Sequence, residues 1–287
     1  MSLLIPVCTP HQKLLERLRG RRLVLRIKSL GLINEAVVLS QQCGVQVHCL
    51  IVAGSAPLED FDFAQEHRGI PVALFAPNLG RFRDLAPKLR ILRDLNIRIY
   101  LPLDREENFG GLRILSSLGV PSAAVFHNGC IDWEKAADLM TYALLGRFRH
   151  APIEPFQYLA EHYSGSQRDD FSAVYFNDAT RYVHIDEEGH IALSSQDLED
   201  QRFISAQLKD LDSLIENDEY RERVEIWRRF FLQAEGCAYC EAWRICLGKF
   251  NEFRDANDGC SAFFKEFLEV IEQYQILKTR KMQPWQP

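Results

Sequence analysis

The sequence contains no long hydrophobic run, and we expect no leader segment. Its longest stretch without Asp, Glu, Lys or Arg, Ala36 to Leu58, is interrupted by three glutamines and a histidine. It therefore predicts a helix end joined to a buried strand rather than a membrane span. Met1 to Cys8 is too short for a signal-peptide core and leads directly into a charged segment. Both absences predict a cytoplasmic protein that does not contact membranes.

An excess of positive charge is also lacking. The 287 residues include 34 basic and 40 acidic side chains, which gives a net charge of −6 and argues against nucleic-acid binding. With 47% hydrophobic residues the chain can bury a substantial core, either as one large domain with an appendage or as two domains. In a reducing compartment its eight cysteines are not expected to form disulfides, so clustered cysteines indicate metal or cofactor binding.

A helix stop at Gly or Asn, followed directly by an apolar strand pattern, recurs roughly every 25 residues in the first half of the chain. The expected strands are Arg22–Ile27, Val45–Val52, Ile70–Ala76, Ile97–Leu103, Val120–His127 and a weaker Arg147–Ile153. Helical patterns lie between them. Phe82, Leu85, Leu89 and Leu92 share one helix face, and Asp132 is the expected N-cap of a helix over Trp133–Leu145.

Strands that alternate with helices predict parallel, right-handed βα units and an α/β fold. Six such units form either a doubly wound sheet or a partial (β/α)6 barrel. The strand cores are short, and no glycine-rich phosphate loop follows the first of them, which favours the barrel.

The pattern changes after about residue 155. Three short strands, Ser172–Phe176, Arg181–Asp186 and His190–Ser194, predict a meander. Helices are expected around Ala206–Glu216 and Arg221–Ala234, and a last one over about 261–277. We therefore divide the chain into a barrel (1–155), a β-meander with linking helices (156–235) and a cysteine-bearing segment (236–287).

Four cysteines of the last segment, Cys237, Cys240, Cys246 and Cys260, follow the spacing C-x2-C-x5-C-x13-C. Four thiolates so close in sequence predict one [4Fe–4S] cluster, for which Trp243, Ile245 and Phe250 would supply an apolar shell. A structural zinc ion is the first alternative, although zinc ribbons usually present two C-x2-C steps. Free or redox-active thiols are the second.

These motifs resemble those of the radical SAM peptide maturases that carry a SPASM domain, in which a six-unit partial barrel precedes an iron–sulfur extension. The extension of that family has seven cysteines and two auxiliary clusters. Here Ser194 and Phe250 stand where two of those cysteines would be, and the cysteine expected before Gly189 is absent. The resemblance implies that the first auxiliary cluster is lost, whereas the four remaining cysteines are the full ligand set of the second.

The family also needs C-x3-C-x2-C after its first barrel strand, because three thiolates leave one iron free to bind SAM. Residues 28–34, which follow Ile27, contain no cysteine, and the glycine-rich SAM-binding turn is poorly matched by Ala53-Gly54-Ser55. No SAM binding is therefore expected. The resemblance implies a non-catalytic, stand-alone SPASM protein of the GeoRSP type. Its expected partners are a radical SAM peptide maturase and a precursor peptide, which it would serve by electron transfer or by binding.

The alternative is an independent enzyme that uses the carboxyl ends of the barrel strands, with a structural cluster or zinc. The polar residues expected at that end of the sheet are His127, Asn128, Cys130, Asp104, Asn108 and Glu154. No spacing motif supports such a site. Cys43 and Cys49 are expected to be small core residues.

Overall fold

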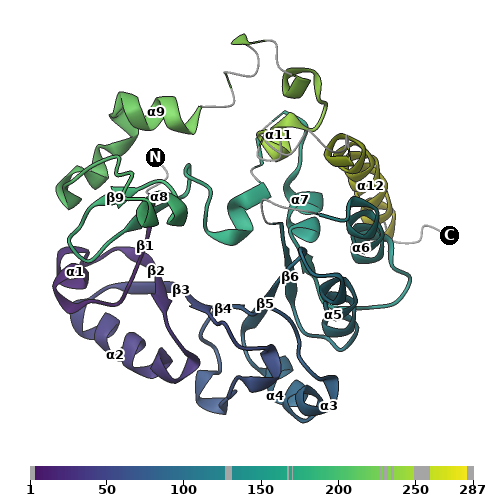
Figure 1. Ribbon diagram of the computed structural model, residues 1–287, viewed down its shortest axis with the longest axis horizontal. Coiled ribbons are helices and arrows are strands. Elements are labelled where there is room, and N and C mark those ends of the chain that lie inside the picture. Colours follow the sequence, from purple (N-terminus) through teal and green to yellow (C-terminus); the bar gives the residue numbers. More distant parts are fainter. Residues whose placement is uncertain are drawn as a thin grey trace. The chain divides into compact units, whose positions relative to one another are not determined.

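The computed structural model describes residues 4–126, 131–166, 168–169, 171–225, 228, 232–233, 236–248 and 259–282. The chain is an α/β protein built on a nine-stranded sheet (Figure 1). The strands are β1 (Ile5–Cys8), β2 (Arg22–Ile27), β3 (Gln46–Ala53), β4 (Val72–Phe75), β5 (Ile97–Pro102), β6 (Ser122–Val125), β7 (Ile153–Glu154), β8 (Tyr182–Ile185) and β9 (Ile191–Ala192).

The strand order is β7-β6-β5-β4-β3-β2-β1-β8-β9. From β1 to β7 each strand lies beside the next one in the sequence, whereas β8 lies on the other side of β1, a reversal that doubly wound sheets also have. The recorded pairs are parallel except that of β8 with β9, which is an antiparallel hairpin. The expectation of parallel βα units in an α/β fold is therefore confirmed.

The helices between and after these strands vary widely in length. The α-helices are α1 (Gln12–Arg17), α2 (Ile33–Cys43), α3 (Phe82–Leu85), α4 (Leu89–Asp94), α5 (Glu106–Ser117), α6 (Trp133–Leu145), α7 (Phe156–His162), α8 (Ser195–Glu199), α9 (Asp218–Val224), α11 (Trp243–Cys246) and α12 (Gly259–Met282). The 3₁₀ helices are η1 (Leu30–Leu32), η2 (Leu58–Asp60), η3 (Gln65–His67), η4 (Ala86–Lys88), η5 (Phe171–Tyr175), η6 (Leu208–Asp212), η7 (Leu214–Glu216) and η8 (Gly236–Tyr239).

The two faces of the sheet differ in chemistry. On one face Leu25, Leu50 and Val72 lie in register and are buried, as expected of a face that packs against helices such as α2. The opposite face carries polar side chains, including Arg26 and His184.

Several sequence expectations are met closely. β2 has the expected bounds, and α6 begins after Asp132, whose carboxylate accepts the Lys135 amide at 3.0 Å. Gly44 ends α2 in the left-handed conformation with φ 70°. The expected sixth strand over 147–153 is reduced to Ile153–Glu154.

The strand β1 was not expected from the sequence. It lies between β2 and β8 and pairs in parallel with both. Its four residues are too few to show a period, and Pro6 lies within it. The first βα unit is therefore β1 and α1, one unit earlier than expected.

The meander expected after residue 155 is wrong in its first strand, because residues 171–175 form a 3₁₀ helix. The other two expected strands are present as β8 and β9, which form an antiparallel hairpin, and β8 also extends the main sheet beside β1. The helix expected over Ala206–Glu216 is two short 3₁₀ helices, η6 and η7. The last helix is longer than expected, Gly259–Met282.

Contacts between residues group the chain into two compact units. The first contains Met1–Tyr100 and Tyr175–Ile226, and the second contains Leu101–Val174 and Trp227–Pro287. The three-part division drawn from the sequence stays a prediction. Among the described helices, none is both long and apolar enough to cross a membrane.

Candidate metal centre

The four predicted ligand cysteines all belong to the second unit. Cys237 lies in η8, Cys240 directly follows η8, Cys246 is the last residue of α11, and Cys260 is the second residue of α12. Cys237 is buried, with 9% of its surface exposed, and the other three are half-buried. The four cysteines are therefore partly, but not fully, shielded from solvent.

Tight backbone turns bring the first three of these cysteines into a short coil. The amide of Cys240 donates to the carbonyl of Cys237 at 3.2 Å, and the amide of Cys246 donates to Ala242 at 3.1 Å. Leu247, which caps the carboxyl end of α11, has a left-handed φ of 53° and is followed by Gly248 with φ 75°. These hydrogen bonds fix the backbone conformation of the segment that carries the first three cysteines.

Apolar side chains accompany the coil. Ile245 is fully buried and Ala242 is 1% exposed. Trp243 is half-buried, and the Arg244 guanidinium lies 4.8 Å from its ring centroid. Two of the three residues expected to form the apolar shell are therefore next to the cysteines, while Phe250 lies outside the described residues.

The start of α12, which carries Cys260, is fixed by an aromatic cluster that the sequence analysis missed. The ring of Phe263 lies 5.2 Å from Trp133 of α6 and 5.9 Å from Phe126, which follows β6. The other members of the cluster are Phe156, Phe171, Phe264 and Phe267. The signal was available in the sequence as Phe263, Phe264 and Phe267, one apolar helix face.

Polar contacts hold the middle of the same helix. The side-chain amide of Gln275 donates to the carbonyls of Ala160 and Tyr163, at 3.1 and 3.0 Å, at the end of α7. Lys278 pairs with Glu161 at 2.9 Å. Burial raises the pKa of the Tyr163 phenol, and the nearby Arg244 charge opposes that rise. α12 therefore packs along its length against α6 and α7, the helices that follow β6 and β7.

Cys260 lies in the first turn of the 24-residue helix α12. The amino end of a helix carries partial positive charge, which stabilises a thiolate or a negatively charged group bound to it. This placement suits a metal ligand, because the thiolate is the form of cysteine that binds metal.

The cysteines outside this segment are core residues where the structure describes them. Cys43 and Cys49 are buried, as expected. Burial raises the pKa of Cys49 to about 11 and that of Cys8 to about 12, so both thiols are protonated at neutral pH. Neither has the chemistry of a reactive or metal-binding thiolate.

The alternative site at the strand ends receives little support. His127, Asn128 and Cys130 lie outside the described residues. The amide of Asn108 donates to the carbonyl of Pro102 at 2.7 Å, and Glu154 accepts the amide of Tyr158 at 2.7 Å, so both have structural hydrogen bonds. Asp104 is exposed.

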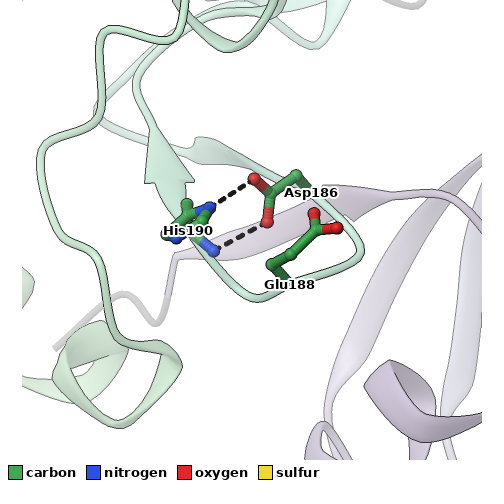
Figure 2. Close-up of side chains that lie close together, drawn as sticks. All are labelled: Asp186, Glu188 and His190. Carbon is green, nitrogen blue, oxygen red and sulfur yellow. Dashed lines mark hydrogen bonds and ion pairs between the residues drawn. The ribbon is translucent and has the colours of Figure 1, made fainter.

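One group of three ligand atoms within 4.8 Å of one another occurs among the residues that the structure describes: Asp186, Glu188 and His190, in the turn between β8 and β9 (Figure 2). One carboxylate oxygen of Asp186 accepts the amides of Gly189 and His190 at 2.8 Å, and the other pairs with Nδ1 of His190 at 2.6 Å. Arg17 donates to the carbonyl of Glu188 at 3.3 Å. Because Asp186 already accepts these hydrogen bonds and the Arg17 guanidinium lies beside the turn, we infer that the group stabilises the hairpin.

Comparisons of the chain with protein-family models, curated proteins and solved structures return no significant match.

Proposed function

We propose that this chain is a non-catalytic iron–sulfur subunit that works with a separate radical SAM enzyme to modify a ribosomally made peptide. The observation that carries the proposal is the set of Cys237, Cys240, Cys246 and Cys260, half-buried or buried in one unit and bordered by the positive end of α12. Four thiolates in apolar surroundings next to a helix terminus match the needs of an anionic cluster.

By ligand type, four cysteine thiols, the donor set fits a [4Fe–4S] cluster, and no three of these sulfurs lie within 4.8 Å of one another in the described part of the chain. When bound, such a cluster supplies one-electron transfer at a potential set by hydrogen bonds, charge and solvent exposure. Of the chain's own residues, Ile245 and Ala242 limit solvent, and the aromatic cluster holds the start of α12, where Cys260 lies. A zinc ion bound by the same thiolates remains the competing proposal, and elemental analysis separates the two.

The proposal of a subunit that does not cleave SAM rests on the sequence. The structure makes β1 the first strand of the βα series, and the residues that follow it are Thr9, Pro10 and His11. The cysteine nearest to this loop is Cys8, the last residue of β1. No C-x3-C-x2-C spacing follows either β1 or β2. The chain therefore offers no three-cysteine site with an iron left open for SAM.

The sequential strand order supports the further proposal that the βα units form a partial barrel of the radical SAM kind. In such a barrel successive strands are neighbours, as β1 to β7 are here. Under this proposal residues 236–287 are the remnant of a SPASM extension, with the ligands of one cluster retained.

The deciding experiment begins with a search of the neighbouring genes for a radical SAM peptide maturase with the C-x3-C-x2-C motif. Co-expression with that enzyme is followed by co-purification and a peptide modification assay. We expect a stable complex, and loss of modification when Cys246→Ser replaces the wild type while the complex persists. Cys43→Ser is the matched control, because Cys43 is a core thiol of the other unit. Full modification without this chain, or the absence of any complex, would overturn the proposal.

A further inference from the structure

Among the residues that the structure describes, three buried polar atoms on neighbouring strands of the first unit have no hydrogen-bond partner. They are Oγ1 of Thr9, Nε of Arg26 and Nδ1 of His184. Thr9 directly follows β1, Arg26 is near the end of β2, and His184 is in β8, on the other side of β1. Buried polar groups are nearly always paired in native proteins, so three such atoms on adjacent strands require an explanation.

The strand register places these residues on the same face. Cys8 pairs with Leu25, so the next residues along, Thr9 and Arg26, lie side by side. Val7, two residues before Thr9, pairs with His184. Thr9 and Arg26 lie at the carboxyl ends of parallel strands, where α/β proteins bind their ligands.

Arg26 is the most informative of the three. Its side chain is half-buried, and within the described part of the chain it has no ion pair. Burial lowers the pKa of its guanidinium, although Cys8 and Glu199 oppose the shift. A partly buried cation without a partner is unfavourable, and a bound anion would relieve that cost.

His184 defines what else the ligand must offer. It is 3% exposed, and its Nε2 lies 3.1 Å from the carbonyl of Phe176, so Nε2 carries the hydrogen and Nδ1 is left as an acceptor. Burial, aided by the Arg26 charge, lowers the pKa of His184 to about 4, so the ring is neutral at pH 7. The ligand must therefore offer a hydrogen-bond donor to Nδ1 of His184 and a negatively charged group to Arg26.

We propose that Arg26, Thr9 and His184 bind a phosphate group. A phosphate that retains one proton has negatively charged oxygens for Arg26 and a hydroxyl that can donate to Nδ1 of His184. A simple carboxylate has the first but not the second. Two acidic side chains of α8 act on this group, Asp197 on His184 and Glu199 on Arg26. Asp197 is paired with Arg202 and Arg223 at 2.9 and 2.8 Å, so its charge is offset, and Glu199 forms no ion pair with Arg26 within the described residues. The site is independent of the cysteines, which belong to the other unit.

The test is calorimetric binding to the full chain of inorganic phosphate, glycerol phosphate and acetate, with chloride at matched ionic strength as the baseline. We expect both phosphates to bind and acetate to bind at least about tenfold more weakly. A higher affinity for glycerol phosphate would identify a phosphorylated molecule as the ligand, and a higher affinity for inorganic phosphate would identify free phosphate.

Arg26→Gln should weaken phosphate binding by about tenfold or more, because a charge-assisted hydrogen bond is lost. Arg22→Gln, the same change at the opposite end of β2, is the control and should bind like the wild type. Thr9→Val gives a second test that leaves the charge unchanged and should also weaken binding. Undetectable binding of phosphate at about 10 mM, affinity for acetate equal to that for phosphate, or unchanged binding by Arg26→Gln would overturn the proposal.

Discussion

Gly259 lies so close to the indole of Trp133 that a Cβ on residue 259 would be 2.5 Å from Cδ1 of Trp133. Side chains do not tolerate such a separation, so only glycine fits at this position without a shift of α6 or α12. Because Cys260 is the next residue, the same contact fixes the position from which one predicted metal ligand extends.

Gly259→Ala should therefore loosen the start of α12. We expect the free energy of unfolding to fall by about 1–3 kcal/mol, as in other overpacked sites, and bound metal to be released faster to a chelator. Gly110→Ala is the control, since Gly110 lies within α5 and a Cβ there meets nothing within 4 Å. That variant should be unchanged or more stable by up to about 1 kcal/mol. Equal stability and metal retention in both variants would show that the Trp133 contact does not anchor α12.

The composition of the metal centre is the second prediction. Protein reconstituted without oxygen should hold about four iron and four sulfide per chain and absorb as a brown iron–sulfur protein. Cys240→Ser and Cys246→Ser should lose the iron and destabilise the second unit, because ligand binding is coupled to folding. Cys49→Ser should retain the iron content, since Cys49 is a buried core residue of the first unit. Stoichiometric zinc without sulfide would favour the structural zinc site instead.

SAM cleavage is the third prediction, and it is negative. With a strong reductant and SAM, the reconstituted chain alone should form no 5′-deoxyadenosine, because in the proposed cluster all four cysteines of the segment are ligands and no iron is left open for SAM. Chromatography of the reaction products measures this directly. The Cys246→Ser variant sets the background, and clear formation of 5′-deoxyadenosine above it would contradict the assignment of a non-catalytic subunit.

The fourth prediction concerns pH. The pKa of His184 is about 4 in the folded chain and near its ordinary value of 6.5 in the unfolded chain. The unfolded chain therefore binds the proton first, and the free energy of unfolding falls as the pH drops from 6.5 towards 4, by on the order of 3 kcal/mol. His184→Gln keeps a donor for the carbonyl of Phe176 and should flatten this dependence. Denaturant titrations in phosphate-free buffer measure it, and equal slopes for variant and wild type would refute the account.

The regular βα units could be predicted because the residues that specify each strand and helix are close together in the sequence. The bounds of β2 and the Asp132 cap of α6 follow from short patterns of apolar and capping residues. β1 and the 3₁₀ helix η5 could not be predicted, because each is set by tertiary partners. β1 pairs on both edges, and η5 packs Phe171 against Phe126 at 4.8 Å.

The candidate sites divide in the same way. The cysteine segment is visible from spacing alone, since its ligands are close in sequence. The group of Thr9, Arg26 and His184 is not, because β1, β2 and β8 bring the three together through strand register. A lone Arg within an apolar strand is the only trace that it leaves in the sequence.

The position of β1 between β2 and β8 has a consequence for biosynthesis. A ribosome produces β1 early and β8 late, so one edge of β1 has no partner while the intervening residues are made. At the usual rate of translation this delay is on the order of ten seconds or more. During that time the edge exposes unpaired amide and carbonyl groups to other chains. The nascent protein should therefore need a chaperone that keeps other chains from pairing with β1. This need ends when Tyr182–Ile185 emerges and completes the parallel pairing.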